Sequence, residues 1–421
     1  MAPVRLLFYR VSYYSSRYNC QCAMAAPVQQ LRGTHMQIQD PGSVGLDAAR
    51  LRRLSEAVAR DVGAGLYDGA VLAVGRHGSL VLHEAIGNSD LAAGRAARVD
   101  DVFAVMSLSK TLTNVLVLNR CERGLLRLTM PVAELIPEFG MLGKQRITVQ
   151  HLLAHTGGLG GMPPVPLDRM PLAAALAAVC MFPPLSRPGQ DVSYSGLTAH
   201  VVLAELVRRA DGGQRAYRQI LDQDLFQPLG MHSTALGLRA DLQARRVPIV
   251  VRDRSPGILP APMMESYNEV LGEHAEVPAI GVYSTAADFY RFSEMLRRGG
   301  ELDGVRLLSP RMIELASSNQ TGSKINALFS FACESRGWEP FPAYLGLGFS
   351  LRGDGIFPTP FGVLSSPRTF GHVGGGGTMF WVDPAQDLCF VVLTAGLLEE
   401  AANVERFQRL SDLVLAAVVG P

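Results

Sequence analysis

The sequence predicts a mixed α/β (α+β) fold, in which an antiparallel sheet flanked by helices carries an inserted, mostly helical lobe. Strand-forming runs occur near both ends of the 421-residue chain, and helical patterns dominate the region between them. A sheet assembled from both ends brings distant segments together and leaves the middle of the chain for a second lobe. A chain of this length also exceeds what one simple hydrophobic core usually fills. We therefore expect two lobes with a site in the cleft between them.

The predicted boundaries follow the changes in pattern along the chain. Residues 40–100 and 275–421 are assigned to the mixed α/β lobe, and residues 101–274 to the mostly helical lobe, with the active site at the lobe interface. Residues 1–39 contain arginines but no acidic residue, and form an N-terminal tail that is either disordered or an over-extended start, because Met36 opens directly onto an ordinary domain beginning. A transit peptide or a signal sequence is the alternative. The compartment is left open, with the cytoplasm favoured over export or an organelle.

Hydrophobic spacing and turn residues predict the elements in order. The spacing of Leu51, Leu54 and Val58 predicts a helix from Asp47. Two strand-forming runs flank a turn at residues 76–79, and a second pair flanks a turn at Asp383 and Pro384. These four strands are predicted at 69–75, 80–85, 379–382 and 388–393. Further helices are predicted at 107–121, 149–155, 197–210, 218–225, 285–296 and 404–418, with a Gly- and Pro-rich loop at 157–171.

Composition disfavours several classes of protein. The formal net charge is +1, and Lys and Arg are not concentrated anywhere, so no nucleic-acid partner is expected. The longest apolar run, Leu172 to Phe182, is shorter than the roughly 18 residues that cross a bilayer, so no membrane span is expected. The six cysteines form no C-x-x-C pair, and His151 and His155 lack the H-E-x-x-H pattern. We expect neither a metal nor another cofactor. No feature predicts an oligomeric state.

An S-x-x-K motif, Ser107-Leu108-Ser109-Lys110, stands where a helix is predicted to begin. A serine hydroxyl is a weak nucleophile unless a neighbouring group takes its proton, and a desolvated lysine does this whereas arginine does not. The chain has kept lysine here although only three of its 39 basic residues are lysines. The motif indicates a nucleophile, Ser107, with a base, Lys110. A surface lysine on a helix is the alternative.

Two further segments carry groups suited to the same chemistry. The turn from Arg187 leads into a helix and places the phenol of Tyr194 at a loop tip, where it acts as a base beside an ammonium or simply packs. The glycine-rich segment Phe370–Thr378 precedes a hairpin and lets backbone N–H groups approach a ligand. We expect the N–H groups of Ser107 and Gly375 to form an oxyanion hole. A flexible turn or a phosphate loop is the alternative, although G-K-[ST] is missing.

These motifs, in this order, resemble the serine β-lactamase and penicillin-binding protein superfamily in its class C-like branch. The segments "ITVQHLLAHTGGL", "LFQPLGMHSTAL" and "GHVGGGGTMFWVDPAQDL" look like segments of that family, and the likeness runs from about residue 47 to the C-terminus. The resemblance implies a β-lactamase/transpeptidase-like fold. It also implies catalytic roles for Ser107 as the acylated nucleophile, for Lys110 and Tyr194 in exchanging its proton, and for His372 where lactamases usually carry lysine.

Two departures from the family pattern bear on the substrate. Where the family carries Y-x-N, this chain has Tyr194-Ser195-Gly196, without the amide that would contact a β-lactam or a peptide. Where the family carries K-T-G, it has His372-Val373-Gly374, without a fixed positive charge for a substrate carboxylate. Both departures favour uncharged esters. The resemblance then points to β-lactamase-like carboxylesterases and lovastatin-type acyltransferases, with a β-lactamase, a D-amino-acid peptidase or a catalytically idle acyl-ligand binder as alternatives.

The expected partner is a small-molecule ester or acyl substrate, and a few residues are expected to contact it. Gly374 and Gly376 belong to the glycine-rich segment. Met162 stands in the Gly- and Pro-rich loop, and Trp338 in a stretch that also contains Phe329, Phe341 and Tyr344. These apolar side chains are expected to line an acyl pocket, and ordinary core packing is the alternative.

Overall fold

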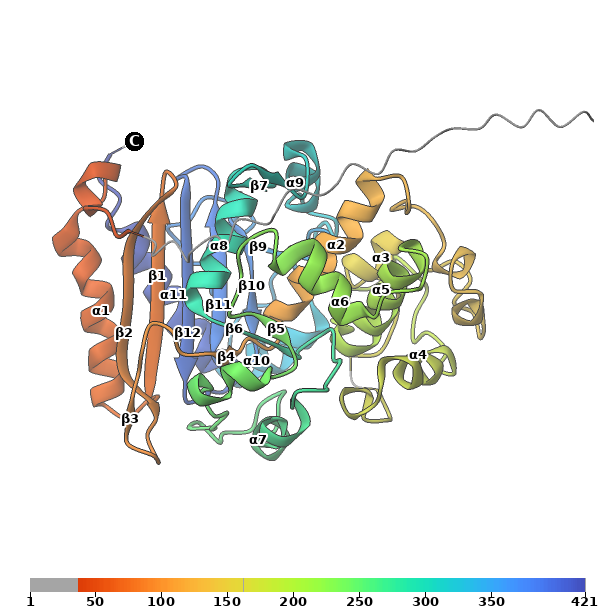
Figure 1. Cartoon of the computed structure of the whole chain (residues 1–421), viewed down its shortest axis with the longest axis horizontal. Helices are drawn as coiled ribbons and strands as arrows, with labels where there is room; N and C mark the ends of the chain where they lie inside the picture. The colour runs from red at the N-terminus through yellow and green to blue at the C-terminus, as the bar shows by residue number, and fades with distance from the viewer. Residues whose placement is uncertain (1–36, 162, 421) are drawn as a thin grey trace, which may run out of the picture. The chain divides into compact units, whose positions relative to one another are not determined.

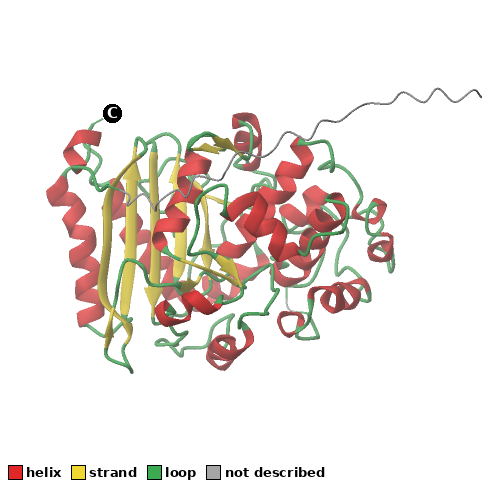
Figure 2. Cartoon of the chain, viewed as in Figure 1, coloured by secondary structure: helices red, strands yellow, loops and turns green. Residues whose placement is uncertain are grey.

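The computed structural model of the protein describes residues 37–161 and 163–420. Met162 and most of the predicted tail, residues 1–39, lie outside the described residues, so what the sequence predicts for them stays a prediction. Figure 1 shows the described chain from α1 at its beginning to the C-terminus, and Figure 2 shows its helices and strands.

The main sheet joins the two ends of the described chain (Figures 1 and 2). Within the described residues its strands are β1 (Gly69–Arg76), β2 (Ser79–Asp90), β3 (Arg95–Ala96), β9 (Ser350–Leu351), β10 (Phe370–Gly374), β11 (Thr378–Asp383) and β12 (Leu388–Ala395). They lie in the order β3-β2-β1-β12-β11-β10-β9, and each neighbouring pair is antiparallel. Gly69 lies opposite Ala395, so the N-terminal hairpin pairs directly with the C-terminal one. The predicted antiparallel sheet is confirmed.

The helices confirm most of the predicted ranges and add several short ones. In the described residues they are α1 (Ala48–Gly63), α2 (Leu108–Glu122), α3 (Val149–Leu153), α4 (Leu172–Cys180), α5 (Gly196–Ala210), α6 (Tyr217–Leu221), α7 (Ala261–Val270), α8 (Ala286–Arg297), α9 (Pro310–Ala316), α10 (Ser330–Arg336) and α11 (Glu400–Leu415). A π-helical turn, Asp222–Phe226, follows α6, and 3-10 turns occupy Pro41–Val44, Val132–Glu134, Pro137–Gly140, Leu167–Arg169, Ala240–Arg245 and Ala327–Phe329. No described helix has the length and apolar character of a bilayer-spanning segment.

Helices cover both faces of the main sheet (Figure 1). Side chains alternate along β11, so Trp381 and Phe380 point to opposite faces. The indole N–H of Trp381 donates to Ser411 Oγ of α11 at 2.9 Å, on the face that α1 and α11 share. The ring of Phe380 contacts Phe289 and Phe292 of α8 on the other face. Because both faces are covered, β1 and β12 are buried along their whole length.

The helix α2 lies where the sheet meets the helical region. It packs against α5 on one side and against β10 and β11 on the other. Nearly all of its side chains are buried as a result, which is the pattern of a helix surrounded by protein. A small sheet of β4 (Phe103–Ala104), β6 (Val282–Ser284) and β5 (Ala235–Leu236) also joins residues from both predicted lobes. The lobe boundaries themselves stay a prediction.

The remaining differences from the predicted elements have local causes. The helix predicted at 404–418 begins at Glu400 because the carboxylate of Glu399 accepts hydrogen bonds from the N–H groups of Ala401 and Ala402. Glutamate is outside the usual set of N-cap residues, so the sequence does not reveal this start. The two-residue strands β4, β5 and β6, and the pair β7 (Glu301–Leu302) and β8 (Val305–Arg306), are too short to show an alternating pattern.

Candidate active site

A strained turn presents Ser107 at the beginning of α2. Met106, immediately before it, has a φ of 49°, in the left-handed region that residues with a side chain seldom occupy. Two contacts hold the turn: Thr378 Oγ1 donates to the Val105 carbonyl at 2.9 Å, and the Val282 N–H donates to Ser109 Oγ at 3.1 Å. Backbone strain of this kind persists only where the surroundings enforce it, as at active sites. Ser107 itself is the N-cap residue of α2, and its hydroxyl forms no capping bond.

Lys110 meets the Ser107 hydroxyl from the first turn of α2. Its Nζ atom lies 2.8 Å from Ser107 Oγ and donates to the Ala279 carbonyl at 2.8 Å. The side chain is only 2% exposed. Burial lowers the pKa of Lys110 to about 7, because the charged ammonium loses its hydration. The amine is therefore available as a base near neutral pH, with one hydrogen on Ala279 and its lone pair free for the serine proton.

Tyr194 completes the group from the segment that leads into α5. Lys110 Nζ lies 5.3 Å from the centre of the Tyr194 ring, and the phenol hydrogen-bonds with Ser107. Burial raises the pKa of Tyr194, and the bond with Ser107 lowers it less than burial raises it. A lowered amine pKa beside a raised phenol pKa favours a neutral amine with a neutral phenol over an ammonium with a phenolate. Of the two bases that the sequence suggests, Lys110 is the better suited.

His372 lies on β10 and faces the same group. Its ring centre is 6.1 Å from that of Tyr194, and its Nδ1 donates to the Val373 carbonyl at 2.8 Å. Burial, together with the nearby Lys110, lowers the pKa of His372 to about 4. The imidazole is thus neutral at physiological pH and offers a bare Nε2. It supplies no positive charge for a substrate carboxylate, as expected from the missing lysine of K-T-G.

The glycine-rich segment after β10 closes against the turn that carries Ser107. A Cβ on Gly374 would lie 2.5 Å from the Val105 carbonyl oxygen, so only glycine allows this approach. Within the described chain, the N–H groups of Ser107 and Gly375 have no acceptor. Two unpaired donors on neighbouring segments are what the predicted oxyanion hole requires.

A cavity of about 540 Å³ opens in front of these groups. Its lining includes Ser107, Lys110, Tyr194, His372, Gly374, Gly375 and Gly376. Phe329, Phe341 and Tyr344 also line it, as predicted for that stretch. Most of the remaining lining is apolar, contributed by proline, methionine, leucine and isoleucine side chains. The volume is typical of a small-molecule site.

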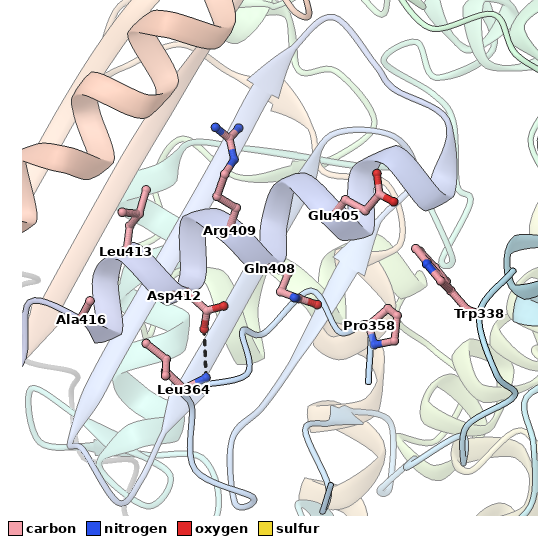
Figure 3. Close-up of a pocket in the computed structure, with 9 residues that line it drawn as sticks. All are labelled: Trp338, Pro358, Leu364, Glu405, Gln408, Arg409, Asp412, Leu413 and Ala416. Carbon is pink, nitrogen blue, oxygen red and sulfur yellow. Dashed lines mark hydrogen bonds between the residues drawn. The ribbon is translucent and has the colours of Figure 1, made fainter. Parts of the chain in front are cut away.

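Trp338 lies elsewhere, which corrects its predicted place in the substrate pocket. It lines a separate hollow beside the outer side of α11, together with Pro358, Gln408 and Asp412 (Figure 3). The chain turns after α10, where Gly337 adopts a left-handed φ of 65°, and Trp338 is half-buried there. Hydrophobicity alone does not distinguish it from its neighbours Phe329 and Phe341. The other apolar residue predicted for the pocket, Met162, lies outside the described residues.

Three supporting groups escaped the sequence reasoning. The Ala279 carbonyl, which accepts from Lys110, is 169 residues away along the chain and carries no local signal. The His155 ring lies 4.6 Å from that of Tyr194, and His200 Nδ1 and Nε2 lie 3.1 Å from the Gly196 carbonyl and from Asn114 Oδ1. Burial lowers the pKa of both histidines, to about 3 for His155, so both are neutral supports of this region. Only the phrase "HLLAHTGGL" marked His155 in advance.

His151 and His155 lie on either side of the end of α3. α3 ends at Leu153, and His155 lies beyond this end with a φ of 54°. The two imidazoles therefore do not share one face of a helix. His151 Nδ1 accepts the Thr148 N–H at 3.1 Å and helps to cap α3. Among the described residues, no group of three or more His, Cys, Asp or Glu side chains is arranged to hold a metal ion.

Gly196, where the family pattern has asparagine, makes room for the lysine. A Cβ at this position would lie 2.7 Å from Lys110 Cε and 3.2 Å from Nζ. We expect Gly196→Ala to lower kcat by about 10²-fold, because a displacement of about 1 Å at a reacting group costs that much. Alanine favours a helix over glycine by about 1 kcal/mol, so the fold itself should not suffer. Steady-state kinetics and thermal unfolding test this prediction. An unchanged kcat would show that a Cβ at residue 196 does not displace Lys110.

Comparisons with known proteins bear on the family and the fold of the chain. A family model described as Beta-lactamase matches residues 54–414. The Esterase/beta-lactamase LipL of Mycobacterium tuberculosis is 27% identical over 364 residues, which cover 79% of this chain and 78% of LipL. A penicillin-binding protein homolog from Caulobacter crescentus has a TM-score of 0.74 at 23% identity, covering 89% of this chain and 99% of the homolog. EstCE1, described as a hydrolase with promiscuous acyltransferase activity, has a TM-score of 0.70 at 22% identity, with coverages of 87% and 99%.

The structural likenesses confirm the β-lactamase/transpeptidase-like fold, and the family match extends over far more than half of the chain. It begins within α1, on the sheet side, and ends within α11, so it takes in the sheet, the helical region and the cavity between them. The chain belongs to the beta-lactamase family.

Proposed function

We propose that this chain is a serine-dependent acyl-transfer enzyme for uncharged esters, either a carboxylesterase or an ester-using acyltransferase. The observation that carries the proposal is the 2.8 Å contact between Ser107 Oγ and Lys110 Nζ, an amine whose pKa burial lowers to about 7. A lysine that only fills space in the structure does not need to be unprotonated. A lysine that accepts the proton of a serine must be unprotonated.

The proposed reaction passes through an acyl-enzyme. Lys110 takes the proton of Ser107 as Oγ attacks the ester carbonyl, and the N–H groups of Ser107 and Gly375 bind the oxygen that becomes negative. The tetrahedral intermediate collapses when the C–O bond to the alcohol breaks, and the alcohol receives a proton from the Tyr194 phenol, which the Lys110 ammonium restores. Water or a second alcohol then attacks the acyl-enzyme and loses its proton to Lys110. As the acyl C–O bond to Ser107 breaks, the Lys110 ammonium returns this proton to Oγ, and the acid or the new ester leaves.

Esters fit this site better than β-lactams or D-amino-acid peptides. Those substrates carry a carboxylate, and His372, with its pKa lowered to about 4, is neutral where the family's lysine would pair with that group. The amide of the Y-x-N pattern is absent at Gly196. The name of LipL includes both esterase and beta-lactamase, which supports an ester substrate and keeps a β-lactam as the alternative. EstCE1 is described as a hydrolase with promiscuous acyltransferase activity, which supports either water or an alcohol as the acceptor.

A substrate panel with active-site labelling tests the proposal. We expect turnover of p-nitrophenyl acetate, butyrate and octanoate, little or no turnover of nitrocefin or a D-Ala-D-Ala peptide, and a fluorophosphonate adduct on the peptide that contains Ser107. Added short alcohols would yield transesterified product if the enzyme is an acyltransferase. Faster hydrolysis of nitrocefin than of any ester would contradict the ester assignment. Stoichiometric release of p-nitrophenol without turnover would indicate an acyl-ligand binder instead.

The pH profile tests the state of the lysine. The base must be unprotonated, and burial lowers the pKa of Lys110 from 10.5 to about 7. We therefore expect kcat/KM on a neutral ester to rise about tenfold per pH unit below about pH 7 and to level off above it. His372, whose pKa is near 4, should add no step above pH 5. A rate that keeps rising towards pH 10 would show an ordinary, solvated lysine.

A further inference from the structure

One wall of the cavity consists of four aromatic side chains, three of which are stacked on one another. The ring centres of Phe341 and Phe357 are 5.0 Å apart and those of Phe357 and Tyr344 5.6 Å apart, with the planes of each pair nearly parallel. Phe329 adds a tilted ring 6.3 Å from Phe341. All four residues line the cavity and are only half-buried, although they come from three separate chain segments. We call this group the aromatic wall.

The aromatic wall is held from behind. The Arg352 guanidinium is buried and lies 5.3 Å from the centre of the Phe357 ring. It donates to the carbonyls of Gly362 at 3.0 Å, Gly353 at 2.9 Å and Val363 at 3.3 Å, and so fixes the loop that carries Phe357. The Tyr344 ring packs on Gly353, where a Cβ would lie 2.5 Å from two of the ring carbons. The rings of Phe357 and Tyr344 are thus ordered before any ligand arrives, which lowers the entropic cost of binding.

Half-buried aromatic rings in a cavity indicate what the cavity binds. A soluble protein seldom leaves clustered apolar side chains open to water without a partner. Offset stacking exposes parts of the ring faces together with the hydrogen-bearing edges, and both attract a further aromatic ring more than a saturated one. We propose that the substrate is an ester with a flat aromatic ring, uncharged near the ester, and that the aromatic wall binds this ring while Ser107 attacks the carbonyl. The proposal rests on the proposed esterase or acyltransferase function.

The test compares substrates that differ only in flatness. Benzyl acetate and cyclohexylmethyl acetate differ in the alcohol, and methyl phenylacetate and methyl cyclohexylacetate differ in the acyl group, while neither ring is conjugated to the ester. We expect kcat/KM to favour the aromatic member of at least one pair by about tenfold, as two aromatic contacts predict. In the double variant Phe341→Leu/Phe357→Leu the ratio should fall to about two or less, because the aromatic member of the pair loses more than its saturated partner.

A matched control and a binding measurement make the test decisive. Phe182→Leu removes a half-buried phenylalanine that does not line the cavity, and should leave the ratio unchanged. Binding is measured by calorimetric titration of non-hydrolysable amides into Ser107→Ala protein. One pair, N-benzylacetamide and N-(cyclohexylmethyl)acetamide, represents the alcohol side. The other pair, N-methyl-2-phenylacetamide and N-methyl-2-cyclohexylacetamide, represents the acyl side. Equal binding within both amide pairs, or an aromatic preference that survives in the double variant, would overturn the proposal. If the wild type hydrolyses none of the esters but the amides still bind with an aromatic preference, only the proposed function is refuted.

Discussion

Ser107→Ala is expected to lower kcat on p-nitrophenyl butyrate by about 10⁴-fold or more, because without Oγ no acyl-enzyme forms. The residual rate would come from the unpaired N–H groups of Ser107 and Gly375, which still bind the oxyanion of a water attack. The variant should fold as the wild type does, since the Ser107 hydroxyl caps no helix. Steady-state kinetics and thermal unfolding on the same preparation measure both quantities.

A second serine in the same region serves as the control. Ser193 stands beside Tyr194, is half-buried and does not line the cavity. Ser193→Ala should therefore retain wild-type turnover and fluorophosphonate labelling, whereas Ser107→Ala should lose both. Labelling that persists in Ser107→Ala, or turnover within tenfold of the wild type, would place the nucleophile elsewhere and remove the basis of the mechanism.

The parts of this site that the sequence predicts are those with a local signal. Ser107 and Lys110 are three residues apart at the beginning of one helix, so their contact follows from helix geometry alone. The two hairpins at opposite ends of the chain are strongly apolar, which indicates strands that are buried on both faces. One sheet that contains both hairpins, with β1 next to β12, buries them together. Glycine density marked the segment around Gly375 before its close approach to Val105 was known.

The parts that the sequence does not predict depend on tertiary contacts. The carbonyl of Ala279 orients Lys110 across 169 residues, and any residue type supplies a carbonyl. Trp338 and Phe341 are equally hydrophobic and only three positions apart, yet the turn at Gly337 places the first outside the cavity and the second within it. The aromatic wall likewise depends on Arg352, whose role is set by three carbonyls on a loop that no pattern identifies.

Lys110→Arg is expected to lower kcat by about 10² to 10⁴-fold, the usual contribution of a general base. Arginine keeps the positive charge and the hydrogen-bond donors but does not release its proton in this pH range. Lys110→Met, which has nearly the same shape without a nitrogen, should lose as much. If the lysine acted only by its charge, arginine would retain most of the activity, so comparing the two variants separates a base from an electrostatic role.

The second fully buried lysine of the described residues provides a matched control. Lys144 Nζ donates to the carbonyls of Cys180 at 2.9 Å and Phe182 at 2.5 Å, and burial lowers its pKa as well. It does not line the cavity. Lys144→Met should therefore reduce the free energy of unfolding by about 1 to 3 kcal/mol, because the carbonyls of Cys180 and Phe182 lose their hydrogen-bond donor. Its kcat should stay near the wild-type value. Equal losses of kcat in both methionine variants would indicate general destabilisation.

The lowered pKa of Lys110 also has a signature in protein stability, which reports the protonation state of the amine independently of catalysis. An unfolded lysine keeps its proton up to about pH 10.5, whereas the folded protein releases the Lys110 proton near pH 7. Between these values the unfolded state binds more protons, so raising the pH favours the folded state, by up to about 1.4 kcal/mol per pH unit. Below about pH 7 both states hold the proton and this contribution becomes constant.

Urea unfolding at several pH values measures this difference between the wild type and Lys110→Met. The wild type should gain stability relative to the variant from about pH 7 upwards, because methionine carries no proton to release. The midpoint of kcat/KM and the onset of this relative gain should then coincide, since both report the same amine. If the two proteins respond to pH in parallel, Lys110 is protonated in the folded state throughout, and it does not serve as the base for Ser107.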